Sequence, residues 1–191
     1  MPKLVDHEAR RDALADVTVM LVATAGLRAV TIRSVAAAAG FSTAVVTHYF
    51  EGKRQLLLYT YKFVSGRAYR RIEATARADG NLAATLAAAL PTTEESRRDW
   101  LVWSVFLALA ISDPEFSEMQ REQYDIALRW LENLLRHEGE EMDPAPTDRA
   151  RALLSFLIGL GMQAAFDPGP WPASLQASLL LSEIEAKWHR R

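Results

Sequence analysis

The sequence has 191 residues, 50% of them hydrophobic and 24% charged, which excludes collagen-like, low-complexity and wholly disordered chains. It contains no cysteine, so disulfide scaffolds, cysteine-ligated zinc and thiol catalysis are excluded as well. The net charge is only −2, but residues 1–72 hold 11 Lys and Arg against 5 Asp and Glu, and the remainder holds 11 against 19. The basic first third predicts contact with a polyanion.

The N-terminal residues are polar and lack the apolar core of a signal peptide. The longest apolar runs, Leu101–Ile111 and Ala152–Phe166, are shorter than the roughly 20 residues that a membrane-spanning helix needs. We therefore expect a protein without a membrane segment that works in the cytoplasm.

Helical periodicity dominates the chain. One apolar stripe predicts a first helix: Leu14, Val17, Leu21 and Ala25. Gly26 follows as its C-terminal cap, because glycine takes the left-handed conformation without strain. Thr31 is a preferred N-cap residue and predicts a short helix over 32–39 that stops at Gly40, and Ser42 is the N-cap of the next one.

A turn at residues 51–53 precedes a long helix that we expect from Lys53 into the late seventies. Prolines divide the rest into helical stretches near residues 82–90, 95–112, 115–139, 147–166 and 173–189. No window alternates with a period of two between hairpin turns, so strands are not expected. We predict an all-α fold of about nine helices, with an N-terminal three-helix domain at 1–53 and a larger domain at 54–191.

Residues 31–50 read as helix, glycine turn and helix, which is typical of a helix-turn-helix module. Five apolar residues would pack inward and fix the angle between the helices: Val35, Ala36, Phe41, Val46 and Phe50. The outward side chains are small or carry hydroxyls, so the backbone can approach base edges closely: Thr43, Ala44, Val45, Thr47 and His48. Phosphates would be anchored by Thr31, Ser42, His48, Tyr49 and Lys53.

To about residue 60, the chain resembles the TetR family of transcriptional regulators. The matching residues, in order, are Gly26, Thr31-Ile32-Arg33, Val35-Ala36, Ala39-Gly40, Phe41-Ser42-Thr43, Thr47-His48-Tyr49-Phe50, Lys53 and Leu56-Leu57. Thr47 departs from the tyrosine that this family often has. In this the chain is similar to the BetI-like branch, whose recognition helix typically ends in Ser-His-Tyr-Phe.

The resemblance implies roles for residues of the module. Thr31, Tyr49 and Lys53 would grip phosphates, and Arg33 would reach a base edge or a phosphate. Four residues would read the DNA sequence: Thr43, Ala44, Thr47 and His48. The alternative interpretation makes the aromatics Tyr49 and Phe50 plain core and the hydroxyl residues simple caps, and for Phe50 we favour the core.

The resemblance also implies a repressor that binds a palindromic operator as a homodimer. A small-molecule effector would release this repressor from the DNA. The later aromatic residues would then surround an apolar or amphipathic effector, and we expect five of them in the pocket: Trp100, Trp103, Phe106, Tyr124 and Trp171. Trp130 belongs to the same aromatic set. Asp113, Glu115 or Asp125 would add negative charge if the effector is cationic, since aromatic faces also bind quaternary ammonium groups. The alternative is an ordinary aromatic core.

Two further groups of residues carry expectations. The basic residues Lys62, Arg67, Arg70 and Arg71 lie on the long helix, and we expect them on a solvated face. The last two helices are apolar enough to pair with a second copy. The expected interface comprises Leu154, Leu157, Ile158, Gly161, Leu179 and Ile184, although the same residues would also complete the core of one subunit.

Signals for catalysis, metals and cofactors are weak. Gly159–Ala164 matches the form of a dinucleotide fingerprint, but no strand precedes it, and small residues there more simply allow close helix packing. We therefore expect no catalytic residues, no metal and no cofactor. The alternatives to a regulator are an all-helical small-molecule-binding protein or enzyme without DNA-binding activity, and a nucleoid-type DNA binder without an effector.

Overall fold

A computed structural model describes residues 7–79, 81–137 and 146–188 of the chain. Over these residues the fold is all-helical, with one short 3-10 helix and nine α-helices. The α-helices are α1 (His7–Ala25), α2 (Ile32–Ala38), α3 (Thr43–Tyr49), α4 (Lys53–Asp79), α5 (Leu82–Ala87), α6 (Glu94–Ala110), α7 (Pro114–His137), α8 (Pro146–Phe166) and α9 (Ala173–Trp188). The described helix ends agree with the sequence prediction within three residues, whereas those expected at 139 and 189 lie outside the described residues.

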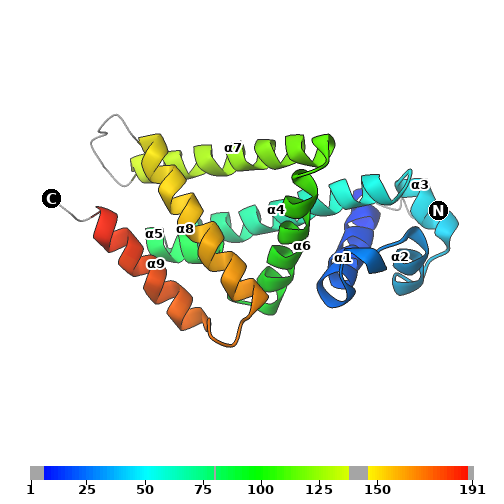
Figure 1. Ribbon diagram of the computed structural model, residues 1–191, viewed down its shortest axis with the longest axis horizontal. Helices are drawn as coiled ribbons and strands as arrows, with labels where there is room; N and C mark the ends of the chain where they lie inside the picture. The colour runs from blue at the N-terminus through cyan, green and yellow to red at the C-terminus, as the bar shows by residue number, and fades with distance from the viewer. Residues whose placement is uncertain (1–6, 80, 138–145, 189–191) are drawn as a thin grey trace.

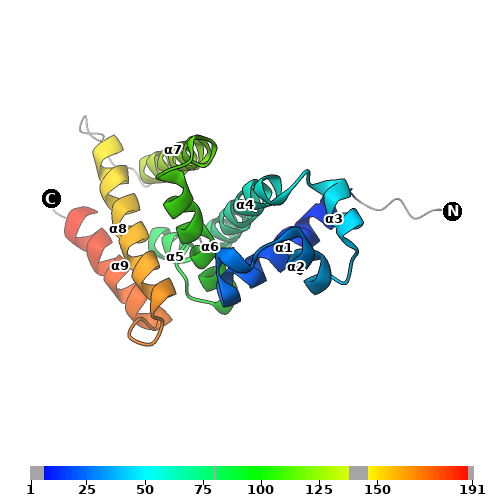
Figure 2. The same ribbon diagram turned by 45° about the vertical axis from the view of Figure 1, so that its right-hand side comes forward.

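The helices form a small head and a larger body, and α4 runs through both (Figure 1). Helices α1, α2 and α3 lie together at one end of the molecule, and α8 and α9 lie at the other (Figure 2). One buried cluster joins the head to the first half of α4 and to α6, through residues such as Leu14, Val46 and Phe106. A second cluster joins α5, α7, α8 and α9 through leucines such as Leu131 and Leu153. The domain boundary after residue 53 stays a prediction, and the first cluster packs across it.

The turns of the head are fixed by local chemistry that the sequence predicts. Gly26 and Gly40 have φ angles of 74° and 71°, a region in which only glycine is unstrained. Ser42 caps α3, because its hydroxyl accepts a hydrogen bond of 3.3 Å from the N–H of Val45. Both glycine turns and the cap confirm the expectation and set α2 and α3 at their mutual angle.

Thr31 caps α2 more completely, and its loss should measurably weaken the head. Its hydroxyl accepts from the Ser34 N–H at 3.0 Å, and the Ser34 hydroxyl accepts from the Thr31 N–H at 2.8 Å. We expect Thr31→Ala to lower the free energy of unfolding by about 1 kcal/mol, because the helix-end N–H of Ser34 loses its partner. Urea unfolding measures this loss. In the control Thr24→Ala, the lost hydroxyl bonds only the carbonyl of Met20 in its own helix, and equal losses in both variants would contradict the capping role.

Candidate functional site

Helix α3 presents one face to solvent and buries the other. Val46 of α3 is 0% exposed, and Phe50, which directly follows the helix, is 1% exposed. Val35 and Ala36 of α2 are buried in the same cluster. Phe41 is half-buried against the same cluster. The exposed residues at and after the start of α3 are Ser42, Thr43, Ala44, Thr47 and His48, all short or polar. The inward and outward sets therefore agree with the helix-turn-helix prediction, except that Val45 is only half-exposed.

An aromatic cluster closes the C-terminal end of α3, and the sequence reasoning did not foresee it. The ring of His7, at the start of α1, lies 4.5 Å from the ring of Tyr49 and 5.9 Å from that of His48, measured between centroids. His48 and Tyr49 are 5.0 Å apart in an edge-on arrangement. Tyr49 is half-buried in this cluster. Its ring therefore packs within the head while part of the side chain is accessible, which is compatible with both interpretations, core packing and phosphate contact. His7 stands far from α3 in the sequence, and only the fold brings it there.

The remaining predicted DNA-contact residues surround α3. Thr31 and Arg33 are exposed at the start of α2. Lys53 is half-buried at the start of α4, and its Nζ donates a hydrogen bond of 3.1 Å to the carbonyl of Leu27. That bond orients the ammonium group and ties α4 to the loop before α2. Two of the three ammonium hydrogens stay available for another acceptor.

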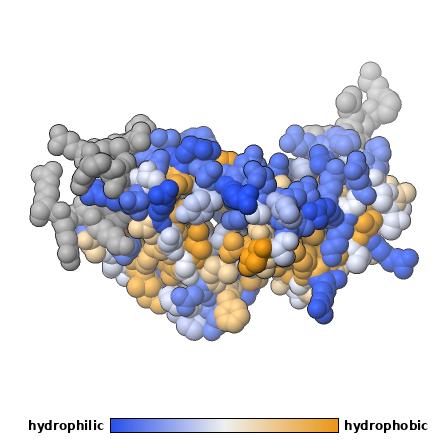
Figure 3. All heavy atoms as spheres, turned by 45° about the horizontal axis from the view of Figure 1, so that its top comes forward, coloured by the Kyte–Doolittle hydropathy of each residue, from blue (hydrophilic) through white to orange (hydrophobic). Residues whose placement is uncertain are grey.

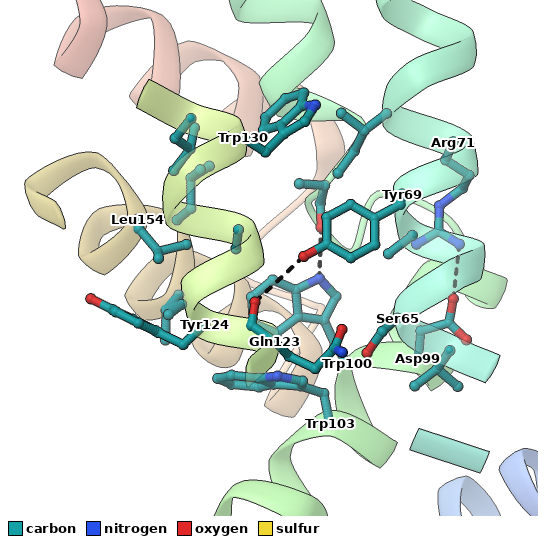
Figure 4. A pocket seen from close by; sticks show the side chains of 18 of the residues that line it. Ser65, Tyr69, Arg71, Asp99, Trp100, Trp103, Gln123, Tyr124, Trp130 and Leu154 are labelled. Carbon is teal, nitrogen blue, oxygen red and sulfur yellow. Dashed lines mark hydrogen bonds and ion pairs between the residues drawn. The ribbon is translucent and has the colours of Figure 1, made fainter. Parts of the chain in front are cut away.

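A cavity of about 180 Å³ lies in the body between α4, α6, α7 and α8. Trp100, Trp103 and Tyr124, which we expected at the effector pocket, line this cavity, and Trp130 and Tyr69 add two further aromatic faces. Figure 4 shows that these aromatic side chains come from three helices, α4, α6 and α7. The lining is mostly apolar and aromatic, which suits a small organic molecule.

Two residues expected in this pocket lie elsewhere. Phe106 is 2% exposed and belongs to the head-side core, where its ring stacks on Tyr61 at a centroid distance of 4.7 Å. Trp171 lies in the turn before α9, and its carbonyl accepts a hydrogen bond of 2.8 Å from Gln176. Phe106 follows Trp103 by three residues, but α6 turns that position toward α4 and the start of α7, away from the cavity.

The acidic residues expected near the effector do not line the cavity either. Asp113 pairs with Arg54 at 2.6 Å, and Arg54 also pairs with Glu115, which joins the start of α4 to the turn between α6 and α7. The hydrogen bond from Arg54 holds the pKa of Asp113 below its usual range. Asp125 is exposed on α7. The charged residues in the lining are instead Arg71 and Asp99.

Asp99 carries a buried ion cluster that corrects a sequence expectation. Its side chain is 5% exposed, and it pairs with Arg71 at 2.8 Å and with Arg67, whose Nε lies 3.1 Å from Oδ1. Arg67 also pairs with Asp16 of α1 at 2.8 Å. The expectation of a solvated face is therefore wrong for Arg67 and Arg71, because this cluster joins α1, α4 and α6. Lys62 and Arg70 of the same helix are exposed, as expected.

The residues expected at a dimer interface mostly pack within their own subunit. Leu154, Leu157 and Ile184 are buried in the second core cluster, and Leu154, Leu157 and Ile158 line the cavity. A Cβ atom on Gly161 would lie 2.5 Å from Cη2 of Trp100, so this glycine allows α8 to approach α6 closely. Among the expected set only Leu179 is exposed, at 37%. The residues that we expected at the interface on α8 thus lie on its buried face. Helix α8 is apolar around much of its surface, so the sequence did not distinguish its two faces.

Comparison with known proteins gives a consistent result. A family model described as "Bacterial regulatory proteins, tetR family" matches residues 14–60, and one described as "BetI-type transcriptional repressor, C-terminal" matches residues 78–189. The chain is 32% identical over 191 residues to the HTH-type transcriptional regulator BetI of Burkholderia thailandensis, an alignment that covers 97% of this chain and 96% of that relative.

Two solved structures share the fold. A transcriptional regulator from Rhodococcus superposes with a TM-score of 0.82 at 24% identity and covers 92% of this chain and 94% of that one. A regulator from Saccharomonospora viridis in complex with choline superposes with a TM-score of 0.80 at 21% identity and covers 94% and 97%. Among the described residues no helix is both long and apolar enough to cross a membrane. With its helix-turn-helix head and its BetI-type C-terminal region, the chain belongs to the TetR family of bacterial transcriptional regulators.

Proposed function

We propose that this regulator is a ligand-responsive repressor that binds a palindromic operator in the cytoplasm as a homodimer. The observation that carries the proposal is the exposed face of α3, where short and hydroxyl-bearing side chains leave room for base edges. Each subunit inserts α3 into a major groove, and the two grooves lie about 34–36 Å apart on one side of the duplex. Thr43, Ala44, Thr47 and His48 read bases, and Thr31, Arg33, Ser42, Tyr49 and Lys53 hold the phosphate backbone.

The dimer forms through the outer faces of α8 and α9. Large apolar side chains are exposed there: Phe166 at 83%, Leu175 at 38%, Leu179 at 37% and Leu181 at 45%. Figure 3 shows apolar surface over this end of the molecule, below a hydrophilic band. Gly159 is exposed on α8, and the space around it would let a second helix approach closely. A self-complementary patch of this kind supports a two-fold dimer of two helices per subunit.

The effector binds in the cavity of the body and weakens DNA binding by linkage. The cavity is lined by one half of α4, from Val64 to Ile72, and the other end of α4 begins directly after α3. A ligand that binds better to a body in which α4 is displaced therefore favours a different spacing of the two heads. The aromatic lining supports an apolar or amphipathic effector.

The test of the DNA-binding assignment uses an operator obtained by selecting bound fragments from genomic DNA. In fluorescence anisotropy, we expect His48→Ala and Tyr49→Phe each to weaken operator binding at least tenfold, because each removes about 1–3 kcal/mol of base or phosphate contact in each of the two subunits. Tyr49→Phe keeps the ring that packs on His7, so the fold of the head is retained.

Arg121→Ala is the matched control, because it removes an exposed cation from α7 without changing the head. It should bind the operator as the wild type does. If the circular dichroism of all variants is unchanged and His48→Ala and Tyr49→Phe also bind like the wild type, the assigned interface is wrong.

A further inference from the structure

Arg71 lines the cavity, and its guanidinium group has more hydrogen-bond donors than its one printed bond uses. One of its terminal nitrogens, Nη1, donates to Asp99 at 2.8 Å and lies 3.9 Å from a carboxylate oxygen of Glu95. Its Nε also lacks an acceptor among the described residues, but it is buried from water-sized molecules, so a ligand in the cavity would bind the terminal nitrogens. Figure 4 shows the guanidinium group above Asp99, at the edge of the aromatic rings. An arginine carries five N–H donors, so this side chain has donor capacity beyond its bond to Asp99.

Asp99, in contrast, has little acceptor capacity left. Its Oδ1 accepts from Arg67 Nε at 3.1 Å and from Arg67 Nη2, and its Oδ2 accepts from Arg71 at 2.8 Å. Asp99 is also the only carboxylate in the described lining of the cavity. A cationic ligand would therefore find no uncommitted carboxylate on the described walls.

Three further polar side chains of the lining, Gln120, Tyr69 and Trp100, also make hydrogen bonds within the protein. Gln120 accepts a hydrogen bond from Tyr61 through Oε1, which leaves its amide hydrogens to donate. Burial raises the pKa of Tyr69, so its hydroxyl stays neutral, and it makes only a long bond of 3.5 Å to the carbonyl of Gln123. The indole of Trp100 donates to the carbonyl of Ala89 at 2.8 Å. The amide hydrogens of Gln120 and the guanidinium group of Arg71 are therefore donors that a ligand in the cavity can use.

We propose that the effector is an amphipathic anion: an apolar body against the aromatic walls, with a carboxylate or similar acceptor group on the guanidinium of Arg71. This inference rests on the cavity being the effector site, and it specifies the chemistry that the site recognises. A guanidinium binds a carboxylate through charge-assisted hydrogen bonds, which are about twice as strong as neutral ones.

Three probes with one body and different head groups test the preference: 4-phenylbutyrate, 4-phenylbutan-1-ol and 4-phenylbutyltrimethylammonium. Their affinities are measured on the full chain by quenching of tryptophan fluorescence, because Trp100, Trp103 and Trp130 line the cavity. We expect the carboxylate to bind at least tenfold more tightly than the alcohol and the trimethylammonium compound. A tighter trimethylammonium compound would overturn the anion preference and favour a cationic effector.

Variants identify the residue that carries the preference. Arg71→Met should reduce carboxylate affinity to that of the alcohol, and Arg71→Lys, which keeps a charge beside Asp99, should retain a smaller preference. Arg70→Met is the matched control, since Arg70 is the neighbouring exposed arginine and should leave all three affinities unchanged. A carboxylate preference that survives in folded Arg71→Met overturns the proposal. If no probe binds the wild type, the cavity itself fails as the effector site, while the DNA-binding assignment keeps its own separate test.

Discussion

Replacing Asp99 with alanine should lower the free energy of unfolding by about 3–5 kcal/mol, because it leaves the guanidinium groups of Arg67 and Arg71 poorly compensated in a buried place. Asp99 is 4% exposed and is the buried carboxylate that both arginines share, whereas their other shared partner, Glu95, is 56% exposed. The loss can be measured as the shift of the urea unfolding midpoint at constant slope. A loss below about 1 kcal/mol would mean that water reaches the arginines and that the cluster is not effectively buried.

Two further variants separate burial of charge from simple loss of packing. Asp16→Asn removes a partner of Arg67 whose side chain is 55% exposed, so its effect should stay below about 1 kcal/mol. The triple variant Arg67→Met, Arg71→Met and Asp99→Leu replaces the buried charges by apolar side chains of similar size. It should recover most of the stability that Asp99→Ala loses, since removing a whole buried ion cluster costs much less than breaking it.

Gly161→Ala should lower the free energy of unfolding by about 1–3 kcal/mol through overpacking between α8 and α6. The added Cβ would lie 2.5 Å from Cη2 and 2.8 Å from Cε2 of the Trp100 indole, so the ring must move. Trp100 lines the cavity and is held by its bond to Ala89, and its displacement should also change the affinity of the fluorescence probes. Thermal unfolding and probe titration measure the two effects.

Gly66→Ala is the appropriate comparison for Gly161→Ala. Gly66 lies inside α4, where an added Cβ would meet only the flexible end of Arg70 at an ordinary contact of 3.6 Å. Alanine favours helix by about 1 kcal/mol over glycine, so Gly66→Ala should be neutral or stabilising. If both variants behaved alike, the close approach at Gly161 would not be a constraint on the packing of α6 and α8.

The head could be predicted nearly completely from the sequence because its structure depends on neighbouring residues. The caps at Thr31 and Ser42 and the glycine turns act within a few residues of themselves. The inward and outward faces of α3 follow from its helical period once Val46 and Phe50 are assigned to the core. His7 was beyond this reasoning, since its contact with Tyr49 depends on the path of α1 across the head.

The body was predicted less well because its contacts join residues that are distant in the sequence. The pairing of Asp99 with Arg67 and Arg71 spans 32 and 28 residues, and no local pattern distinguishes it from a solvated basic face. Trp103 and Phe106 share a helix face, yet Trp103 lines the cavity and Phe106 is buried in the head-side core, because α6 crosses its neighbours between these two positions. Helix α8 is apolar around much of its surface, so periodicity could not assign Leu157 to its own subunit.

The continuity of α4 has a mechanical consequence. Lys53, beside the recognition helix, and Ala68, in the cavity wall, belong to one uninterrupted helix and are about 22 Å apart along its axis at about 1.5 Å per residue. A tilt of about 5° pivoting at the wall moves the far end of such a lever by about 2 Å. Base-edge hydrogen bonds tolerate only a few tenths of an ångström, so a rotation of this size suffices to misalign the head.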